Sequence, residues 1–422
     1  MAKVKMEKLQ AARMSKNALE MVSTIIQRFG SRLSGSSACL DTAKVLADEL
    51  QPVCDRVESE AFTLHPAAFL GWIRIMVALY PIALIFFWFS LPLIALILMV
   101  GGLLIMVYEF LLYRQVIDRW YPKVTGKNVY GIIEPEHAVE KTIVFSGHHD
   151  SAYVFNFLTY KPHLYVIRIG IGLGAFVVLT LASLAQTIAN LATGNFFARG
   201  SLSLIFLLCA IILTLASPWV LQLWFFASDK GSPGAGDNLI SSAMAVQLAH
   251  YFKQNADNGN PLQNTRVVFA SFDGEEAGLR GSRDFYNRHR NDVSVLSKKS
   301  WNFNVDCPYN SKDLSFLTSD INGSVKLSQE MATQCVGIAK SMGFEAFSQP
   351  IAFLTGGTDA GEAAKAGLEA VTLMAMSLGK TKEPRVYHTL DDLPEAIDPH
   401  VVEQALSIAI RFIEQLDADE LA

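Results

Sequence analysis

The chain of 422 residues is long enough for one large domain or two ordinary ones. Hydrophobic residues make up 51% of it and charged residues only 18%, which is more apolar and less charged than a typical soluble domain. The net charge of −5, together with the lack of a basic stripe with interleaved aromatics, argues against a nucleic-acid partner. The five cysteines are irregularly spaced, so they predict neither a disulfide framework nor a CxxC zinc site.

Two helical patterns come first along the chain, at Ser15–Phe29 and Leu40–Leu50. An apolar block follows, and its segment Ile75–Tyr108 contains no Asp, Glu, Lys or Arg. A membrane span takes about 20 helical residues, so this block is too long for one span. Pro92 offers a break because proline removes a helix donor. The block therefore predicts two transmembrane spans, at about 67–89 and 93–112.

A short buried strand, Lys141–Gly147, precedes a second apolar block in which Arg199 is the only charged residue between positions 169 and 228. This block predicts two further spans, at about 164–188 and 202–226. Tryptophans and tyrosines near the span ends fit a membrane better than a soluble core. Basic residues near the span ends lie mainly on the side of the polar segments: Arg114, Arg119, Lys123, Lys161, Arg168 and Lys230. The positive-inside rule then predicts that the polar part faces the cytoplasm.

The rest of the chain alternates strands with helices. Strands are expected at 265–272, 301–306 and 369–376, and helices at 238–255, 324–342 and 400–416. This pattern predicts an α/β domain whose mostly parallel central sheet is flanked by helices. Two transmembrane helical hairpins interrupt that domain. The expected segments are 1–65, 114–161 and 229–422 for the α/β domain, and 66–113 and 162–228 for the hairpins.

Ionisable residues follow the expected strands, at the sheet edge where ligands bind in such folds. His148 and Asp150 form an H-x-D arrangement in which positions i and i+2 point the same way on extended backbone. His148 can therefore bind a metal while Asp150 accepts from its other ring nitrogen, and His149 points to the opposite side. Glu275 and Glu276 are adjacent and diverge, so one can bind metal while the other serves as a general base.

Three further residues complete the expected cluster. Asp237 lies at a helix start, where it is either a helix cap or a bridging carboxylate. Asp306 ends an apolar strand, where an unpaired carboxylate would be unfavourable to bury. His388 lies in a loop, with Asp392 placed to orient it. Imidazole and carboxylate ligands suit Zn²⁺ and also admit Co²⁺ or Mn²⁺.

These stretches carry a family resemblance. In chain order they are FGSRLSGS (29–36), GKNVYGII (126–133), SGHHDS (146–151), PGAGDNLISSAMAVQLA (233–249), FDGEEAGLRGSRDF (272–285), NVD (304–306), GGTDA (356–360) and YHTLDDL (387–393). The chain resembles the co-catalytic zinc exopeptidases, a family that includes secreted bacterial aminopeptidases, glutamate carboxypeptidases and glutaminyl cyclases. Only the two apolar blocks are foreign to that pattern.

The resemblance implies a role for each residue of the cluster. Asp237 would bridge two zinc ions per chain, with Glu276 and His388 on the first and His148 and Asp306 on the second. Glu275 would be the general base, Asp150 the carboxylate behind His148, and Asp359 and Asp392 supporting acids. One departure concerns the oxyanion donor, since relatives often have a tyrosine where this chain has Phe353, Leu354 and Thr355. Tyr309 and Tyr387 are the alternative donors.

The implied function is a membrane-anchored aminopeptidase. Its partners would be peptides, including hydrophobic or membrane-released ones, and the lipid bilayer. A carboxypeptidase or dipeptidase of the same family stays open, as does a glutaminyl-cyclase-like transferase. A non-catalytic membrane receptor or scaffold is the remaining alternative, although neither Glu275 nor any expected ligand is missing from the sequence.

Overall fold

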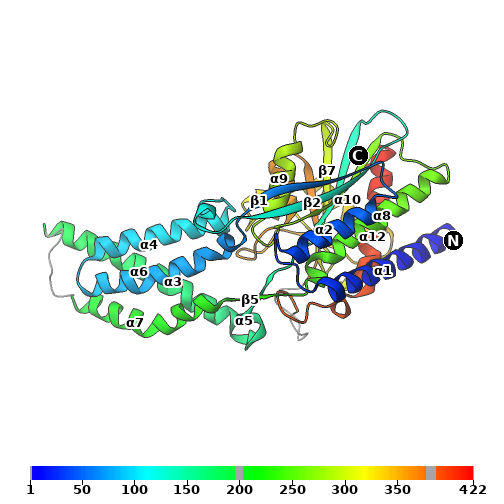
Figure 1. The fold of residues 1–422 in the computed structure, drawn as a ribbon. Helices are drawn as coiled ribbons and strands as arrows, with labels where there is room; N and C mark the ends of the chain where they lie inside the picture. Colours follow the sequence, from blue (N-terminus) through cyan, green and yellow to red (C-terminus); the bar gives the residue numbers. More distant parts are fainter. Residues whose placement is uncertain (1, 195–202, 377–385, 422) are drawn as a thin grey trace. The chain divides into compact units, whose positions relative to one another are not determined.

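An eight-stranded sheet organises the larger part of the chain in this computed structural model, which describes residues 2–194, 203–376 and 386–421 (Figure 1). The four central strands run parallel, whereas β1, β2 and β8 each pair antiparallel with a neighbour. The strands, in spatial order, are β1 (Arg56–Leu64), β2 (Val124–Ile133), β6 (Thr265–Phe272), β3 (Lys141–His148), β7 (Lys299–Pro308), β12 (Glu369–Ala375), β8 (Ser315–Leu317) and β11 (Phe347–Gln349).

Helices cover both faces of this sheet. Alternate side chains of a strand point to opposite faces, so Val267 and Phe269 of β6 belong to one core and Val268 and Phe272 to the other. The first core is closed by α1 (Ala2–Phe29), α2 (Ser37–Leu50), α8 (Ile240–Asp257), α10 (Gln329–Ser341) and α12 (Pro399–Asp417), and the second by α9 (Arg280–His289) and α11 (Asp359–Lys365). The expected α/β fold with a mostly parallel sheet is thus confirmed.

Shorter elements complete this unit, which comprises residues 1–66, 123–154 and 230–422. They are β4 (Tyr153–Phe155), β5 (Ala227–Gly231), β9 (Ser319–Asp320), β10 (Val325–Lys326), η5 (Ala235–Leu239), η6 (Ser311–Asp313) and η7 (Pro394–Ala396). Strands β4 and β5 cross the boundary of the unit, since β4 ends one residue beyond it and β5 begins before it. The helix expected from residue 324 begins only at Gln329. Val325 and Lys326 pair with β9 instead, and the Ser328 side chain accepts from Met331 N to start the helix.

A second unit, residues 67–122 and 155–229, consists of helices. Four of them are long and apolar enough to cross a membrane, with mean hydropathy between 2.0 and 2.5. They are α3 (Pro66–Trp88), α4 (Pro92–Met106) continued by η1 (Val107–Leu111), α6 (Tyr165–Ala192) preceded by η3 (Pro162–Leu164), and α7 (Leu204–Leu221) continued by η4 (Gln222–Phe225). The short helices α5 (Asn156–Thr159) and η2 (Asp118–Trp120) lie near their ends.

The packing of this helical unit fits an apolar surrounding. Its interior holds aromatic contacts such as Tyr80 against Phe176, whose ring centroids are 5.3 Å apart, and Tyr80 also donates to Leu213 O at 2.8 Å. Its outer surface is apolar, with Val166, Ile205 and Leu215 each more than 70% exposed. Exposed aliphatic side chains on all four helices are what lipid contact would favour.

Candidate metal centre

The carboxyl ends of three neighbouring strands deliver ionisable side chains to one edge of the sheet. His148 is the last residue of β3 and pairs with Phe272, the last residue of β6. Glu275 and Glu276 follow β6 three and four residues later, and Asp306 lies near the end of β7. Because these strands are parallel, their carboxyl ends meet at the same edge.

Two loops complete the cluster. Asp237 lies in η5, just before α8, and the Asp237–Asn238 peptide bond is cis. The preceding residue, Gly236, lets this loop pack directly against the Tyr309 ring, since a Cβ at Gly236 would lie 2.2 Å from that ring. His388 follows β12 in the loop of residues 386–393.

The Asp237 carboxylate lies between two histidines. Its Oδ1 is 3.4 Å from His148 Nε2, and its Oδ2 is 2.9 Å from His388 Nε2. Glu276 Oε1 is 3.4 Å from His388 Nε2, and Glu275 Oε2 is 3.7 Å from His148 Nε2. Donor atoms of His148, Glu275 and Asp306 also lie within 4.8 Å of one another. The structure therefore brings together all five ligands expected from the sequence, with Glu275 beside them.

Crowding of buried carboxylates raises most of their pKa values. Burial, and then the charge of Asp237, raises the pKa of Glu276 to about 7 and that of Asp306 to about 6. Burial, with Asp306 and Glu276 nearby, holds the pKa of Glu275 well above its usual value. The exception is Asp237, because burial would raise its pKa but contacts with the two histidines lower it. The site thus concentrates negative charge that only protons or cations can balance.

This donor set fits a divalent cation. Burial alone would lower the pKa of His388, but Glu276 and Asp237 raise it to about 10. Within the described residues, His148 Nε2 and Glu276 Oε1 are buried without a hydrogen bond, an arrangement that is unfavourable unless another group occupies the space. Imidazole nitrogens and carboxylate oxygens at this spacing are ligands that Zn²⁺ accepts.

Asp150 supports the ligands from behind. Its Oδ1 lies 3.2 Å from His148 Nδ1, and Ser34 Oγ donates to its Oδ2 at 2.7 Å. The backbone N–H groups of Glu275 and Glu276 donate to the same carboxylate at 3.3 and 3.2 Å. One buried carboxylate therefore links the His148 ring to the loop that carries both glutamates.

The two remaining acids of the sequence analysis also lie in the interior. Asp359 is 1% exposed, and burial followed by the charges of Asp306 and Asp150 raises its pKa to about 7. Asp392 accepts from the backbone N–H groups of Gly236 and Asp237, at 2.9 and 3.2 Å. That Asp392 also orients His388 stays a prediction. Its two oxygens are directed at the loop that carries Asp237, because that loop presents two adjacent amides.

Arg32 is a residue whose role the sequence analysis missed. Its side chain is fully buried and donates to four carbonyl oxygens: those of His149 (2.8 Å), Gly30 (3.1 Å), Pro233 (2.7 Å) and Gly234 (2.8 Å). Burial lowers its pKa to about 10, so it stays charged at neutral pH. Arg32 thus ties the end of β3, which carries His148, to the loop that carries Asp237. The signal available in the sequence was one arginine within the small-residue stretch FGSRLSGS.

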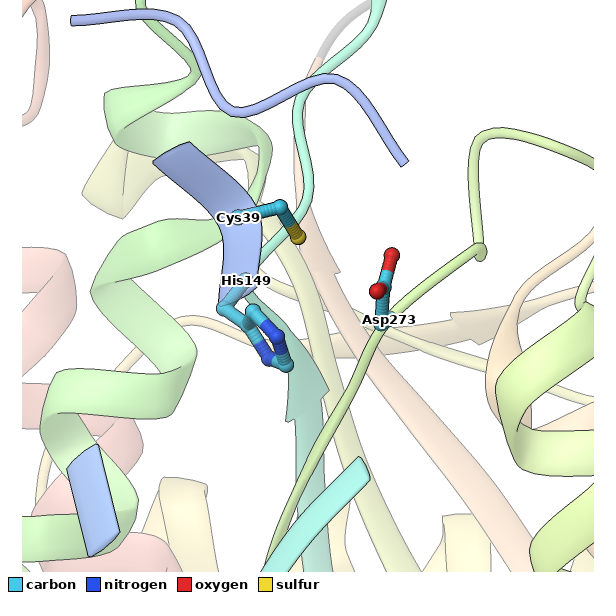
Figure 2. Close-up of side chains that lie close together, drawn as sticks. All are labelled: Cys39, His149 and Asp273. Carbon is cyan, nitrogen blue, oxygen red and sulfur yellow. The ribbon is translucent and has the colours of Figure 1, made fainter. Parts of the chain in front are cut away.

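A second buried cluster lies behind these loops. Cys39 of α2, His149 at the end of β3 and Asp273 after β6 bring donor atoms within 4.8 Å of one another (Figure 2). The Asp273 carboxylate already accepts from Gly35 N (3.1 Å) and Lys127 N (3.0 Å), and burial keeps the pKa of the Cys39 thiol high. Burial also lowers the pKa of His149 to about 3, while its Nδ1 bonds Ser271 Oγ at 2.7 Å. We interpret this cluster as packing that supports the ligand loops.

The candidate oxyanion donors differ in their surroundings. Phe353 is 68% exposed and Tyr309 only 7%, and Tyr309 packs against Gly236. The ring of Tyr387 stacks on His388, with centroids 3.8 Å apart.

Cys307 also lies beside the cluster, although the sequence analysis assigned no metal site to the cysteines. Its thiol lies within 4.8 Å of donor atoms of Asp237 and Asp306. Burial raises the pKa of that thiol well above its usual value.

Comparison with known proteins agrees with this architecture. Residues 224–413 match the model of Peptidase family M28. The chain is similar in structure to a glutaminyl cyclase from Fimbriiglobus ruber (TM-score 0.55, 14% identity, covering 95% of this chain and 94% of that one). It is also similar to BSAP, a zinc aminopeptidase from Bacillus subtilis (TM-score 0.53, 14% identity, covering 94% of this chain and 95% of that one). A third similar structure is a Zn-dependent exopeptidase from Parabacteroides distasonis (TM-score 0.54, 12% identity, covering 95% of this chain and 97% of that one). Identities this low show a shared fold. No curated protein matches the chain by sequence.

Proposed function

This chain carries a domain of Peptidase family M28, and from that premise we propose that it is a membrane-anchored, zinc-dependent aminopeptidase. The observation that carries the proposal is the position of Asp237, with one carboxylate oxygen toward His148 and the other toward His388. A carboxylate in that position is suited to bridge two cations, each of which then needs two further protein ligands.

The chain offers those ligands. His148 and Asp306 would hold one zinc ion, and Glu276 and His388 the other, with Asp237 shared. Two bound zinc ions would lower the pKa of a water molecule between them and polarise the scissile carbonyl. The chain's own residues determine where that chemistry occurs, because every ligand belongs to a strand end or to a loop fixed by buried hydrogen bonds.

Glu275 is the proposed general base. Its carboxylate accepts the proton of the attacking water and returns it to the leaving amine. It lies 3.7 Å from His148 Nε2 and is buried together with the ligands, so its carboxylate is held beside them. Asp150 has a positioning role, since its contact with His148 Nδ1 leaves Nε2 directed at the cluster.

We also propose that the four apolar helices span a membrane and that the catalytic unit lies on its cytoplasmic side. The helices have the length and composition of spans. Basic residues gather at the helix ends next to the polar segments, which is the bias expected for a cytoplasmic face.

A peptide panel tests the catalytic proposal. Zinc-loaded protein in detergent is offered peptides with a free amino terminus, the same peptides acetylated at that terminus, and the same peptides amidated at the carboxyl terminus. We expect cleavage to require the free amine and to tolerate the amide. Glu275→Gln should lower kcat at least about 100-fold, whereas Glu140→Gln, an exposed control, should leave it unchanged.

Other outcomes on the panel identify the alternatives. Cleavage that requires a free carboxyl terminus would indicate a carboxypeptidase. Ring closure of peptides that begin with glutamine, without hydrolysis, would indicate a glutaminyl cyclase, an activity named for one structurally similar protein. Full activity in Glu275→Gln would remove Glu275 as the base.

A further inference from the structure

The exposed charges of the helical unit are strongly biased toward one sign. Its described cations are Arg74, Arg114, Arg119, Lys161 and Arg168. Its described carboxylates are Glu109, Asp118 and Asp229, and only Asp229 is exposed. Glu109 is 0% exposed and accepts from Val116 N at 3.0 Å, so its charge is directed inward. Four of the five cations are therefore exposed, beside one exposed anion, whereas Arg168 is half-buried and donates to Tyr160 O at 3.0 Å.

All five cations lie at the same end of the helical bundle. The four long helices form two hairpins, so the start of α3, the end of η1, the start of α6 and the end of η4 share that end (Figure 1). Arg114 and Arg119 follow η1, and Lys161 and Arg168 flank the start of α6. Arg74 belongs to α3, and its guanidinium carbon lies 5.8 Å from the Trp224 ring on η4. We call these five residues the basic end.

Exposed aromatic side chains accompany the basic end. Trp120 and Tyr160 are each 66% exposed, and Trp224 is 42% exposed. Each is a neighbour of one of the five cations in sequence or in space. Tryptophan and tyrosine prefer the headgroup level of a bilayer, where an apolar ring and a polar edge are both satisfied.

The charge of the basic end is available to a partner. None of the five cations has an ion pair with a carboxylate of the described chain. Arginine donates in a planar fork that matches phosphate oxygens, and lysine offers a compact positive charge. Because positive charge, exposed aromatic rings and apolar helices occur together, the complementary partner is an anionic lipid surface.

We propose that the basic end binds the phosphate headgroups of acidic phospholipids and selects them over neutral ones. The proposal rests on the membrane insertion proposed above but not on the peptidase activity. Each lysine or arginine near an acidic membrane surface raises the affinity for that surface by about fivefold. Several such cations acting together should therefore enrich acidic lipids around the helices.

Spin-labelled lipids test this selection. The full-length protein is reconstituted in phosphatidylcholine bilayers that contain a trace of spin-labelled phosphatidylglycerol or spin-labelled phosphatidylcholine, and the immobilised fraction of each label is measured. We expect the acidic label to be favoured about fivefold or more, and 0.5 M salt to weaken that preference. The triple variant Arg114→Gln, Arg119→Gln, Lys161→Gln should lose most of it.

A matched control removes three exposed lysines of the other unit: Lys298→Gln, Lys312→Gln, Lys326→Gln. It should keep the full preference. Equal immobilisation of both labels by the unaltered protein would overturn the proposal, as would an unchanged preference in the first triple variant. Failure of the protein to insert would remove the membrane proposal as well, whereas insertion without preference would remove this inference alone.

Discussion

Arg32 shows how much of the candidate metal centre depends on one residue outside it. Its guanidinium donates to four carbonyl oxygens from three segments of the chain, and one of them, that of Gly234, also accepts from Leu239 N at 3.2 Å. Lysine cannot reproduce these contacts, because all its donors are on one nitrogen, whereas the guanidinium spreads its donors over a planar fork.

We therefore expect Arg32→Lys to lower the free energy of unfolding by about 2–4 kcal/mol and to weaken zinc affinity. Thermal unfolding in detergent and zinc competition with a chelator measure the two effects. Arg28→Lys, at an exposed position four residues earlier, is the control and should change neither. An Arg32→Lys protein with unaltered zinc affinity would show that the clamp does not position the ligands.

A second residue-scale prediction concerns Glu60 of β1, which joins α9 through His289 Nε2 at 3.0 Å and also accepts from the Tyr130 hydroxyl at 3.0 Å. Burial would raise the pKa of Glu60, but the contacts with His289 and Tyr130 lower it below its usual value of 4.5. Because the folded-state pKa is depressed, its stabilisation is present above about pH 4.5 and is lost as the pH falls through the folded-state pKa.

Glu60→Gln should therefore unfold more easily than the unaltered protein at pH 7, by about 1 kcal/mol, and this difference should shrink as the pH falls below about 4.5. Melting curves across this range give the difference at each pH. Glu58→Gln, an exposed neighbour on the same strand, should show no such trend. If the difference in stability between Glu60→Gln and the unaltered protein stayed constant with pH, the Glu60 carboxylate would not be the source of the effect.

At the residue scale, the sequence was enough to predict the positions of side chains that lie at or just after the end of a strand. His148, Asp306 and the Glu275–Glu276 pair each end or follow an apolar run, so their convergence could be inferred from the parallel sheet. The contacts of Arg32 and Asp392 could not, because they join segments 117 and 156 residues apart along the chain. No local pattern encodes which loop a buried carboxylate will face.

At the scale of single elements, α12 depends on a cap. Asp398 precedes Pro399 and accepts from His400 N at 3.0 Å, and its other oxygen accepts from Ser311 Oγ. The helix itself buries nine hydrophobic side chains against the sheet, among them Leu406 and Phe412. A side chain that satisfies the first amides of a helix typically stabilises it by about 1 kcal/mol.

Asp398→Ala should accordingly reduce stability by about 0.5–2 kcal/mol, measured by chemical denaturation. Asp398→Asn retains an oxygen that accepts from His400 N and should recover most of that loss. If alanine and asparagine were equally destabilising, the hydrogen bond to His400 N would not be the source of the effect.

Strands with continuous apolar runs were the easiest elements to infer. The runs at 265–272 and 369–376 became β6 and β12, because each is mainly apolar and almost entirely buried, as expected of strands covered on both faces. The edge strand β1 was not expected, since it is only partly buried and its charged residues Arg56, Glu58 and Glu60 interrupt any apolar run. Its register depends on pairing with β2, which lies across an entire apolar block.

At the scale of the whole molecule, the chain divides into an α/β unit and a helical unit of different chemistry. The apolar blocks stood out in the sequence because they contain almost no charged residues, whereas the way each unit packs internally required the structure. If the helices span a bilayer as proposed, the full-length protein should stay in the membrane pellet after alkaline carbonate extraction, beside a peripheral marker that is released. Release of the protein into the supernatant would contradict membrane insertion.

The central claim is that Asp237 is shared by two cations. Anomalous difference maps, collected at the zinc absorption edge from crystals grown with zinc, test it most directly. We predict two peaks, one among His148, Asp237 and Asp306 and one among Asp237, Glu276 and His388. A single peak, or none among these five side chains, would contradict the proposed binuclear centre.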